Sequence, residues 1–133
     1  MIFIDTGAFL ARYIQADQFH KKANALWAKI EKKEMKCYTS NFVLNELATL
    51  LFRRTGADFA EIRMMNIYSS TRIEILRPIK EEEMTAINLM KKYSEHEISY
   101  TDCISFCLMK KNKLNTAFTF DEHFSYAGFH FFK

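Results

Sequence analysis

The chain has 133 residues, which fits a single domain, and its 49% hydrophobic and 26% charged residues are typical of a globular protein rather than a disordered one. Its formal charge of +3 is only a weak indication of an anionic partner. No apolar run approaches the roughly 20 residues of a membrane span, and the opening Met-Ile-Phe-Ile-Asp lacks the basic start of a signal peptide. The three cysteines lack the spacing of a disulfide framework, so we expect reduced thiols in a cytoplasmic protein.

The first predicted element is a strand at residues 2–4, an apolar run typical of a central parallel strand that is buried on both faces. Asp-Thr-Gly follows it and marks its carboxyl end, and a helix can begin from Ala8. Asp5 has two interpretations at this position. It is either a turn or N-cap residue, or a carboxylate held at the edge of the sheet where α/β proteins build sites. These residues alone favour neither interpretation.

Further along the chain, amphipathic stretches alternate with short apolar runs. In order, they predict a helix at 20–34, a strand at 37–39, helices at 42–55 and 58–69, a strand at 73–76, helices at 81–95 and 99–111, and strands at 116–120 and 129–132. Several apolar side chains of the fourth and fifth predicted helices are expected in the core: Phe59, Ile62, Met64, Met65, Met84, Ile87, Leu89 and Met90. This alternation predicts a three-layer α/β/α domain with a mostly parallel central sheet of four or five strands.

Glu46 has an unusual position in the helix predicted at 42–55. It lies beside Leu50 at the margin of the apolar stripe, whereas a solvated glutamate more often lies on the opposite face. An ion pair with Arg53 would have to span about 10 Å along the helix axis. Glu46 is therefore a candidate site residue.

Asp102 lies in the first turn of the helix predicted at 99–111. The spacing Ser99-x-x-Asp102 fits a capping box, in which the carboxylate accepts a hydrogen bond from the Ser99 backbone. Phe106 and Met109 share the helix face of Asp102, so the acid points along a partly apolar side. A site residue and a capping residue are both consistent with this pattern.

A fourth acid, Asp121, follows the strand predicted at 116–120. Acids just past a strand or at a helix start occupy the places where α/β sheets build sites. Four acids that arrive at one place from four separate segments would form a metal site, because hard divalent cations prefer carboxylate oxygens. The four acids concerned are Asp5, Glu46, Asp102 and Asp121.

Short motifs around these acids resemble those of the PIN-domain nucleases, in particular the VapC-like toxins of prokaryotic toxin–antitoxin pairs. The motifs, in chain order, are Ile4-Asp5-Thr6, Asn45-Glu46-Leu47, Tyr100-Thr101-Asp102, and Thr119-Phe120-Asp121 before His123-Phe124. One such motif is weak evidence, but four in the same order and context are strong. The resemblance covers essentially the whole chain and implies a single PIN domain over residues 1–133.

The resemblance implies a metal-dependent endoribonuclease that is the toxin of a toxin–antitoxin pair and uses Mg²⁺ or Mn²⁺. Its catalytic and metal-binding residues would be Asp5, Glu46, Asp102 and Asp121, with Thr6, Thr101 and Thr119 in support. Basic side chains proposed to hold the RNA backbone are Arg12, Arg53, Lys110 and Lys111. The implied partners are the RNA substrate, an antitoxin protein and a second copy in a homodimer, with no membrane.

Two other functions explain the sequence less well. The alternative is a non-catalytic RNA- or protein-binding PIN-like module whose acids only cap helices, but capping does not explain Glu46. A phosphatase of the haloacid-dehalogenase type would need a second aspartate at position 7, which is Gly7. The four histidines are expected at the surface or in packing, because metal-activated water needs no histidine base.

Overall fold

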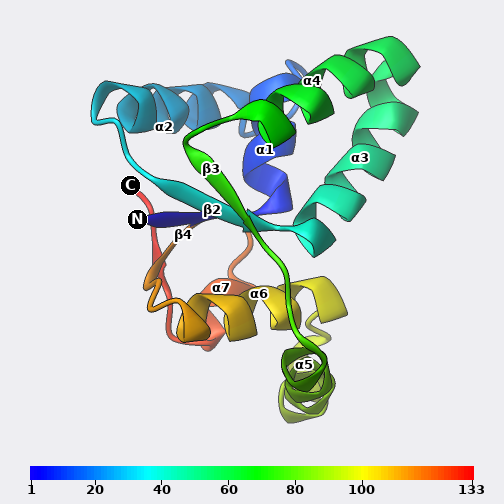
Figure 1. Ribbon diagram of the computed structural model, residues 1–133, viewed down its shortest axis with the longest axis vertical. Helices are drawn as coiled ribbons and strands as arrows, with labels where there is room; N and C mark the ends of the chain where they lie inside the picture. Colours follow the sequence, from blue (N-terminus) through cyan, green and yellow to red (C-terminus); the bar gives the residue numbers. More distant parts are fainter.

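The computed structural model describes residues 1–133, which form a five-stranded sheet between layers of helices (Figure 1). In chain order the elements are β1 (Ile2–Ile4), α1 (Thr6–Tyr13), α2 (His20–Lys32), β2 (Cys37–Ser40), α3 (Asn41–Thr55), α4 (Ala57–Ser69), β3 (Ile73–Leu76), α5 (Lys80–Lys92), the 3₁₀ helix η1 (Ser94–His96), α6 (Tyr100–Lys111), β4 (Thr116–Phe118), α7 (His123–Tyr126) and β5 (His130–Phe131). All strand pairs are parallel, so the predicted fold class is confirmed.

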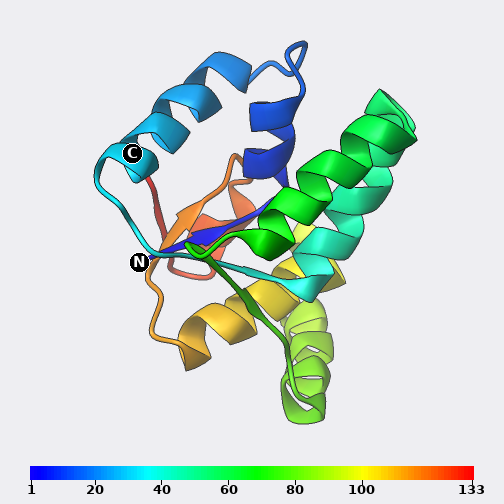
Figure 2. The same ribbon diagram turned by 45° about the horizontal axis from the view of Figure 1, so that its top comes forward.

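The strands lie in the order β3-β2-β1-β4-β5, which places β1 at the centre. The chain first builds the sheet outward through β2 and β3, and then returns to add β4 and β5 on the other side of β1. Right-handed crossovers therefore put the first helices and the later ones on opposite faces. In Figures 1 and 2, α1, α2 and α4 lie on one side of the sheet and α6 and α7 on the other. Such a reversal of direction opens a crevice at the carboxyl ends of the two central strands.

The core is rich in aromatic rings, and it buries β1 on both faces as the apolar run predicts. On one face, the Trp27 ring lies between Phe9 and Phe118, with centroid separations of 5.5 and 5.2 Å. On the other, Phe106 packs edge-on against Phe124 at 5.1 Å. Burying such rings stabilises the fold by roughly 2–3 kcal/mol each. This packing fixes the ends of β1 and β4.

Two helices bury a different face from the predicted one. Ile62 and Met65 of α4 are exposed, and the helix buries Ala60 and Ile67 instead. Positions 60 and 67 are almost two full turns apart and so share one face, whereas the face through positions 62 and 65 points away from the sheet. The prediction of inward Ile62 and Met65 is therefore wrong.

The same correction applies to α5, whose only fully buried residue is Ala86. Met84, Ile87 and Met90 were expected in the core, but they are exposed. The helix packs against α6 through its small residue, and only Leu89 of the predicted set is partly buried. As a result α5 leaves three large apolar side chains exposed to solvent.

The cysteines follow the sequence prediction, whereas the fourth predicted strand is shorter than expected. The three cysteines are all buried and unpaired, as expected of reduced thiols. The fourth predicted strand ends at Phe118 instead of residue 120, and Phe120 and Asp121 beyond its end line a pocket. No helix has both the length and the apolar character needed to cross a membrane.

Candidate functional site

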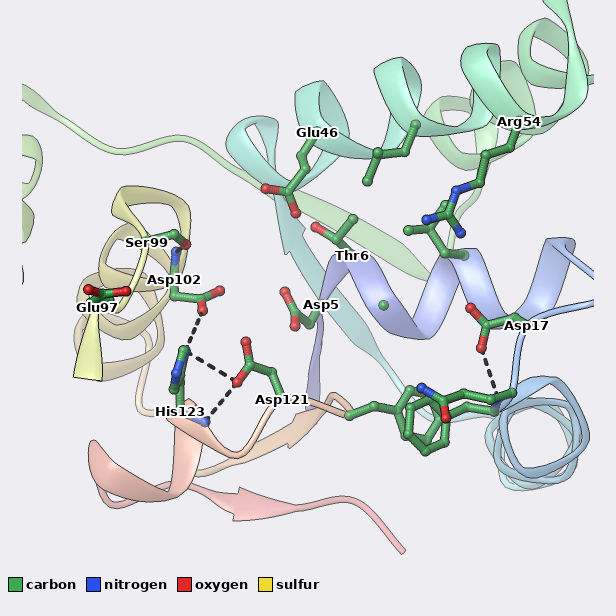
Figure 3. Close-up of a pocket in the computed structure, with 16 residues that line it drawn as sticks. Asp5, Thr6, Asp17, Glu46, Arg54, Glu97, Ser99, Asp102, Asp121 and His123 are labelled. Carbon is green, nitrogen blue, oxygen red and sulfur yellow. Dashed lines mark hydrogen bonds and ion pairs between the residues drawn. The ribbon is translucent and has the colours of Figure 1, made fainter.

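All four acids singled out from the sequence line one hollow of about 430 Å³. Asp5 follows β1 and Asp121 follows β4, so these two lie on either side of the point where the strand order reverses. Asp102 enters from the first turn of α6, and Glu46 from α3. Figure 3 shows the four carboxylates pointing toward one another from four different elements. The structure therefore brings together the residues that the sequence only listed in order.

Asp5 is buried at the floor of the hollow. Its backbone N–H continues the sheet by donating to the Phe118 carbonyl at 3.0 Å, which fixes the residue relative to β4. Its Oδ2 accepts a hydrogen bond from the Thr119 hydroxyl at 2.8 Å. Burial raises the pKa of Asp5 to about 6, and the nearby charges of Asp121 and Glu46 act in the same direction, against the Thr119 hydrogen bond.

Asp102 is held by the start of α6, where its backbone N–H donates to the Ser99 hydroxyl at 3.1 Å. This is one half of the capping box that the sequence suggested. The other half is absent, because the Asp102 carboxylate turns into the hollow instead of bonding to the Ser99 backbone. Burial raises the pKa of Asp102 to about 8, with further contributions from the charges of Asp5 and Asp121.

Asp121 forms a tight turn that brings His123 into the site. The Asp121 Oδ1 accepts the His123 backbone N–H at 2.9 Å, and its own N–H donates to the Thr119 hydroxyl at 3.0 Å. The His123 Nδ1 lies 3.3 Å from Asp121 Oδ1 and 3.6 Å from Asp102 Oδ2. This nitrogen is buried but makes no well-formed hydrogen bond. One ligand atom from each of the three side chains lies within 4.8 Å of the other two.

Thr119 ties two of the acids together, because its hydroxyl donates to Asp5 and accepts from the Asp121 backbone. Thr119→Val is expected to lower the free energy of unfolding by about 1–3 kcal/mol, since it leaves both buried partners unsatisfied. Urea denaturation measures this change. Thr116→Val, at the start of β4, is the matched control, because the Thr116 hydroxyl makes no hydrogen bond, and a loss within about 0.5 kcal/mol is expected there. Equal losses in both variants would contradict the role of the Thr119 hydroxyl.

The remaining predicted site residues differ in whether they line the hollow. Thr6 lines the hollow, and its buried hydroxyl oxygen has no hydrogen-bond partner. Glu46 is half-buried and makes neither a hydrogen bond nor an ion pair, so the possible pairing with Arg53 does not occur. Thr101 does not line the hollow.

The four basic residues proposed from the sequence also lie outside the hollow. Arg12 pairs with Glu31 at 2.9 Å. Arg53 lines a separate shallow hollow on α3. Lys110 and Lys111 are at the far end of α6. The one arginine that lines the acidic hollow is Arg54, which follows Arg53 in α3.

Sequence reasoning missed several residues of this hollow, among them His123 and Arg54. The sequence held a signal for His123. An aspartate side chain often accepts a hydrogen bond from the backbone N–H two residues later, and this turn brings the later residue's side chain close to the aspartate. The signal for Arg54 was weaker. Residues four apart form a slowly winding row on a helix, and Glu46, Leu50 and Arg54 are such a row.

Comparison with known proteins identifies the architecture and the family. The model of the PIN-domain family matches residues 2–130 of the chain. The chain belongs to the PIN-domain family. Within this family it is 36% identical over 129 residues to the 23S rRNA-specific endonuclease VapC20 of Mycobacterium tuberculosis, which covers 97% of this chain and 95% of the relative.

Two solved structures share the fold of this PIN domain. The crystal structure of Mycobacterium tuberculosis VapC20, a sarcin–ricin loop cleaving toxin, superposes with a TM-score of 0.88 at 35% identity, over 97% of this chain and 96% of the other. FitAcB from Neisseria gonorrhoeae superposes with a TM-score of 0.68 at 18% identity, over 100% and 97%. The predicted resemblance to PIN domains of the VapC type is therefore confirmed.

Proposed function

We propose that this protein is a metal-dependent endoribonuclease and the toxin of a toxin–antitoxin pair. The observation that carries the proposal is that four carboxylates from distant segments share one hollow at the switch point of a parallel sheet. Family membership supports it, because the related VapC20 is an endonuclease specific for 23S rRNA. Helix capping does not account for the arrangement, since neither Glu46 nor the Asp102 carboxylate caps a helix.

The residues in the hollow fit a divalent cation. Burial and like charges raise the pKa values of Asp5 and Asp102, which means that the ionised carboxylates lack a positive partner. The buried His123 Nδ1 and Thr6 hydroxyl lack hydrogen-bond partners as well. Oxygen-rich sets of this kind suit Mg²⁺ or Mn²⁺. When bound, such an ion activates water and neutralises charge on the phosphoryl group.

The side chains can be given separate tasks. Asp5, Asp102 and Asp121 would hold the ion, because their carboxylates point toward one another in the hollow (Figure 3), and Glu46 would orient the attacking water or hold a second ion. The Thr6 hydroxyl would donate to water or to a substrate phosphate oxygen. His123 would hold the carboxylates of Asp102 and Asp121 in place through its Nδ1.

The proposed substrate is the sarcin–ricin loop of 23S rRNA, by analogy with VapC20. Purified protein would be incubated with ribosomes in Mg²⁺, in Mn²⁺ or in EDTA, and primer extension would map new 5′ ends. We expect a cut in the loop that appears only with a divalent ion. A cut elsewhere in cellular RNA would retain the enzyme but change its substrate. The absence of metal-dependent cleavage of any RNA would overturn the proposed function.

We also propose that the protein forms a homodimer through α5. Its exposed apolar side chains Met84, Ile87 and Met90 form a surface that a monomer leaves uncovered. Light scattering is expected to give about twice the chain mass of 15.8 kDa, and Ile87→Glu to return it to the monomer value. Thr85→Glu, which adds the same charge at an exposed polar position of the helix, is expected to leave the dimer intact. A monomeric wild type would contradict this proposal.

An antitoxin protein is the further partner we propose, because the related toxins suggest a cognate inhibitor. We place the protein in the cytoplasm, where its substrate is found and where the three buried cysteines stay reduced. Co-purification of a protein encoded beside this one would test the pairing.

A further inference from the structure

The acidic hollow extends well beyond the four carboxylates. Its other end is formed by the aliphatic side chains Leu10 and Leu50, the two rings Phe19 and Phe120, and Arg54. This end contributes nothing to holding a cation, since it offers few carboxylates and mostly apolar groups. One continuous surface therefore joins the acids to a region of different chemistry.

Arg54 is the only arginine or lysine that lines the hollow. Together with Glu46 and Leu50 it belongs to a row of residues four apart, and it lies about 12 Å from Glu46 along the axis of α3. Its guanidinium hangs into the hollow, with Asp17 across from it (Figure 3). Asp17 Oδ1 is already engaged by the Phe19 N–H at 2.8 Å, and Arg54 makes no ion pair. Its five donors are thus available to a ligand.

Phe19 and Phe120 form a rigid aromatic surface at the same end. Their rings stack with centroids 4.4 Å apart and planes only 3° from parallel. Phe120 is anchored from below by Phe118, edge-on at 5.9 Å. Both stacked rings are only half-buried, whereas core phenylalanines such as Phe9 and Phe118 are fully buried. Proteins bind single-stranded nucleic acid with aromatic rings and a guanidinium in one groove, through base stacking and a phosphate contact, and the half-buried rings and Arg54 share this hollow.

We propose that Arg54 and the Phe19–Phe120 pair form a binding subsite for an unpaired nucleotide of the RNA, next to the phosphate that is cut. Arg54 holds a neighbouring phosphate of the strand, and a base lies against the stacked rings. The distribution of charge along the hollow supports this occupant, because a strand whose reacting phosphate lies at the acids meets the single arginine of the hollow at its other end. Positions 46 and 54 are separated by about 12 Å along the axis of α3. The inference rests on the proposed nuclease function and names the form of RNA that this site accepts.

The test compares Arg54→Gln with Arg77→Gln. Both changes remove one exposed arginine that makes no ion pair, but Arg77 does not line the hollow. Binding of a fluorescein-labelled single-stranded RNA of randomised sequence is measured by anisotropy in the Asp102→Asn background, so that cleavage does not consume the probe. Arg54→Gln is expected to weaken binding about tenfold, and to reduce the slope of log K against log salt by about 0.7, the value for one phosphate on a single strand. Arg77→Gln is expected to stay within about twofold.

Several results would overturn the subsite. They are equal losses in the two variants, an unchanged affinity in Arg54→Gln, or no binding of the RNA at all. The nuclease function is judged separately, by cleavage in the otherwise wild-type protein. Absence of metal-dependent cleavage by the wild-type protein would remove the function, whereas normal cleavage with equal effects at positions 54 and 77 would remove only the subsite.

A second variant tests the aromatic part. Phe19→Leu keeps an apolar side chain but removes the stacking ring, and Phe132→Leu is the control, because Phe132 packs on Phe118 and lies outside the hollow. RNA that carries 2-aminopurine reports stacking directly through quenching of its fluorescence. Quenching is expected to fall by at least about half in Phe19→Leu and to persist in Phe132→Leu. Equal quenching in the two variants would show that no base lies on the rings, whatever the variants do to stability.

Discussion

Asp102→Asn is expected to reduce RNA cleavage by about 10³-fold or more, and at the same time to make the metal-free protein more stable at neutral pH. The activity falls because a neutral amide replaces a carboxylate that would hold the divalent ion. The stability rises because the buried carboxylate lacks a positive partner, and its pKa of about 8 shows how unfavourable its charge is. Asparagine has nearly the same shape and keeps the N–H that donates to Ser99.

Cleavage rates under single-turnover conditions measure the first effect, and thermal melting in EDTA measures the second. Asp58→Asn is the control, because Asp58 is an exposed acid in the first turn of α4 and does not line the hollow. It is expected to leave cleavage unchanged. Cleavage by Asp102→Asn within about tenfold of the wild-type rate would contradict the assignment of Asp102 to the ion, since losing a group that stabilises the transition state costs 10²–10³-fold or more.

Opposite effects on activity and stability are typical of residues kept for function. A residue that only capped α6 would behave differently, because its removal would destabilise the protein. The same reasoning explains why the sequence left Asp102 ambiguous. Ser99-x-x-Asp102 has the spacing of a capping box, and its backbone half is indeed formed. Only the fold decides where the carboxylate points, since the reversal of strand order puts a crevice beside the start of α6.

The local sequence pattern was sufficient to predict which residues are buried wherever a segment offers only one way to bury its apolar side chains. The run at residues 2–4 has no polar side chain, so it can only lie in the middle of the sheet, and it does. Apolar residues on α4 and α5 occur on more than one face, so the pattern alone does not select the buried one. Ala60 and Ala86 are buried because a close approach of helices favours small residues at the contact, and this leaves Met65 and Ile87 outside. That choice depends on the neighbouring elements and is not encoded in the helix itself.

Without divalent ions, the protein is expected to become less stable as the pH rises from about 5 to about 8. Burial raises the pKa of Asp5 to about 6 and of Asp102 to about 8, whereas an aspartate in the unfolded chain titrates near 4. Between these values the native state binds more protons than the unfolded state, so the free energy of unfolding falls with rising pH. For Asp102 the loss is on the order of 3 kcal/mol, or roughly 10 °C in Tm for a domain of this size.

Melting curves in EDTA at pH 5, 6, 7 and 8 test this expectation against Asp102→Asn, whose profile should be markedly flatter. Adding Mn²⁺ at pH 8 should restore stability to the wild type, because the ion binds the ionised carboxylates of the native state alone. The restoration should be small at pH 5, where protons compete for the same oxygens, and small in Asp102→Asn at any pH. A wild-type Tm that stays constant or rises from pH 5 to pH 8 in EDTA would show that ionisation of the buried carboxylates does not destabilise the native state. The fit of the hollow to a cation would then lose its main physical support.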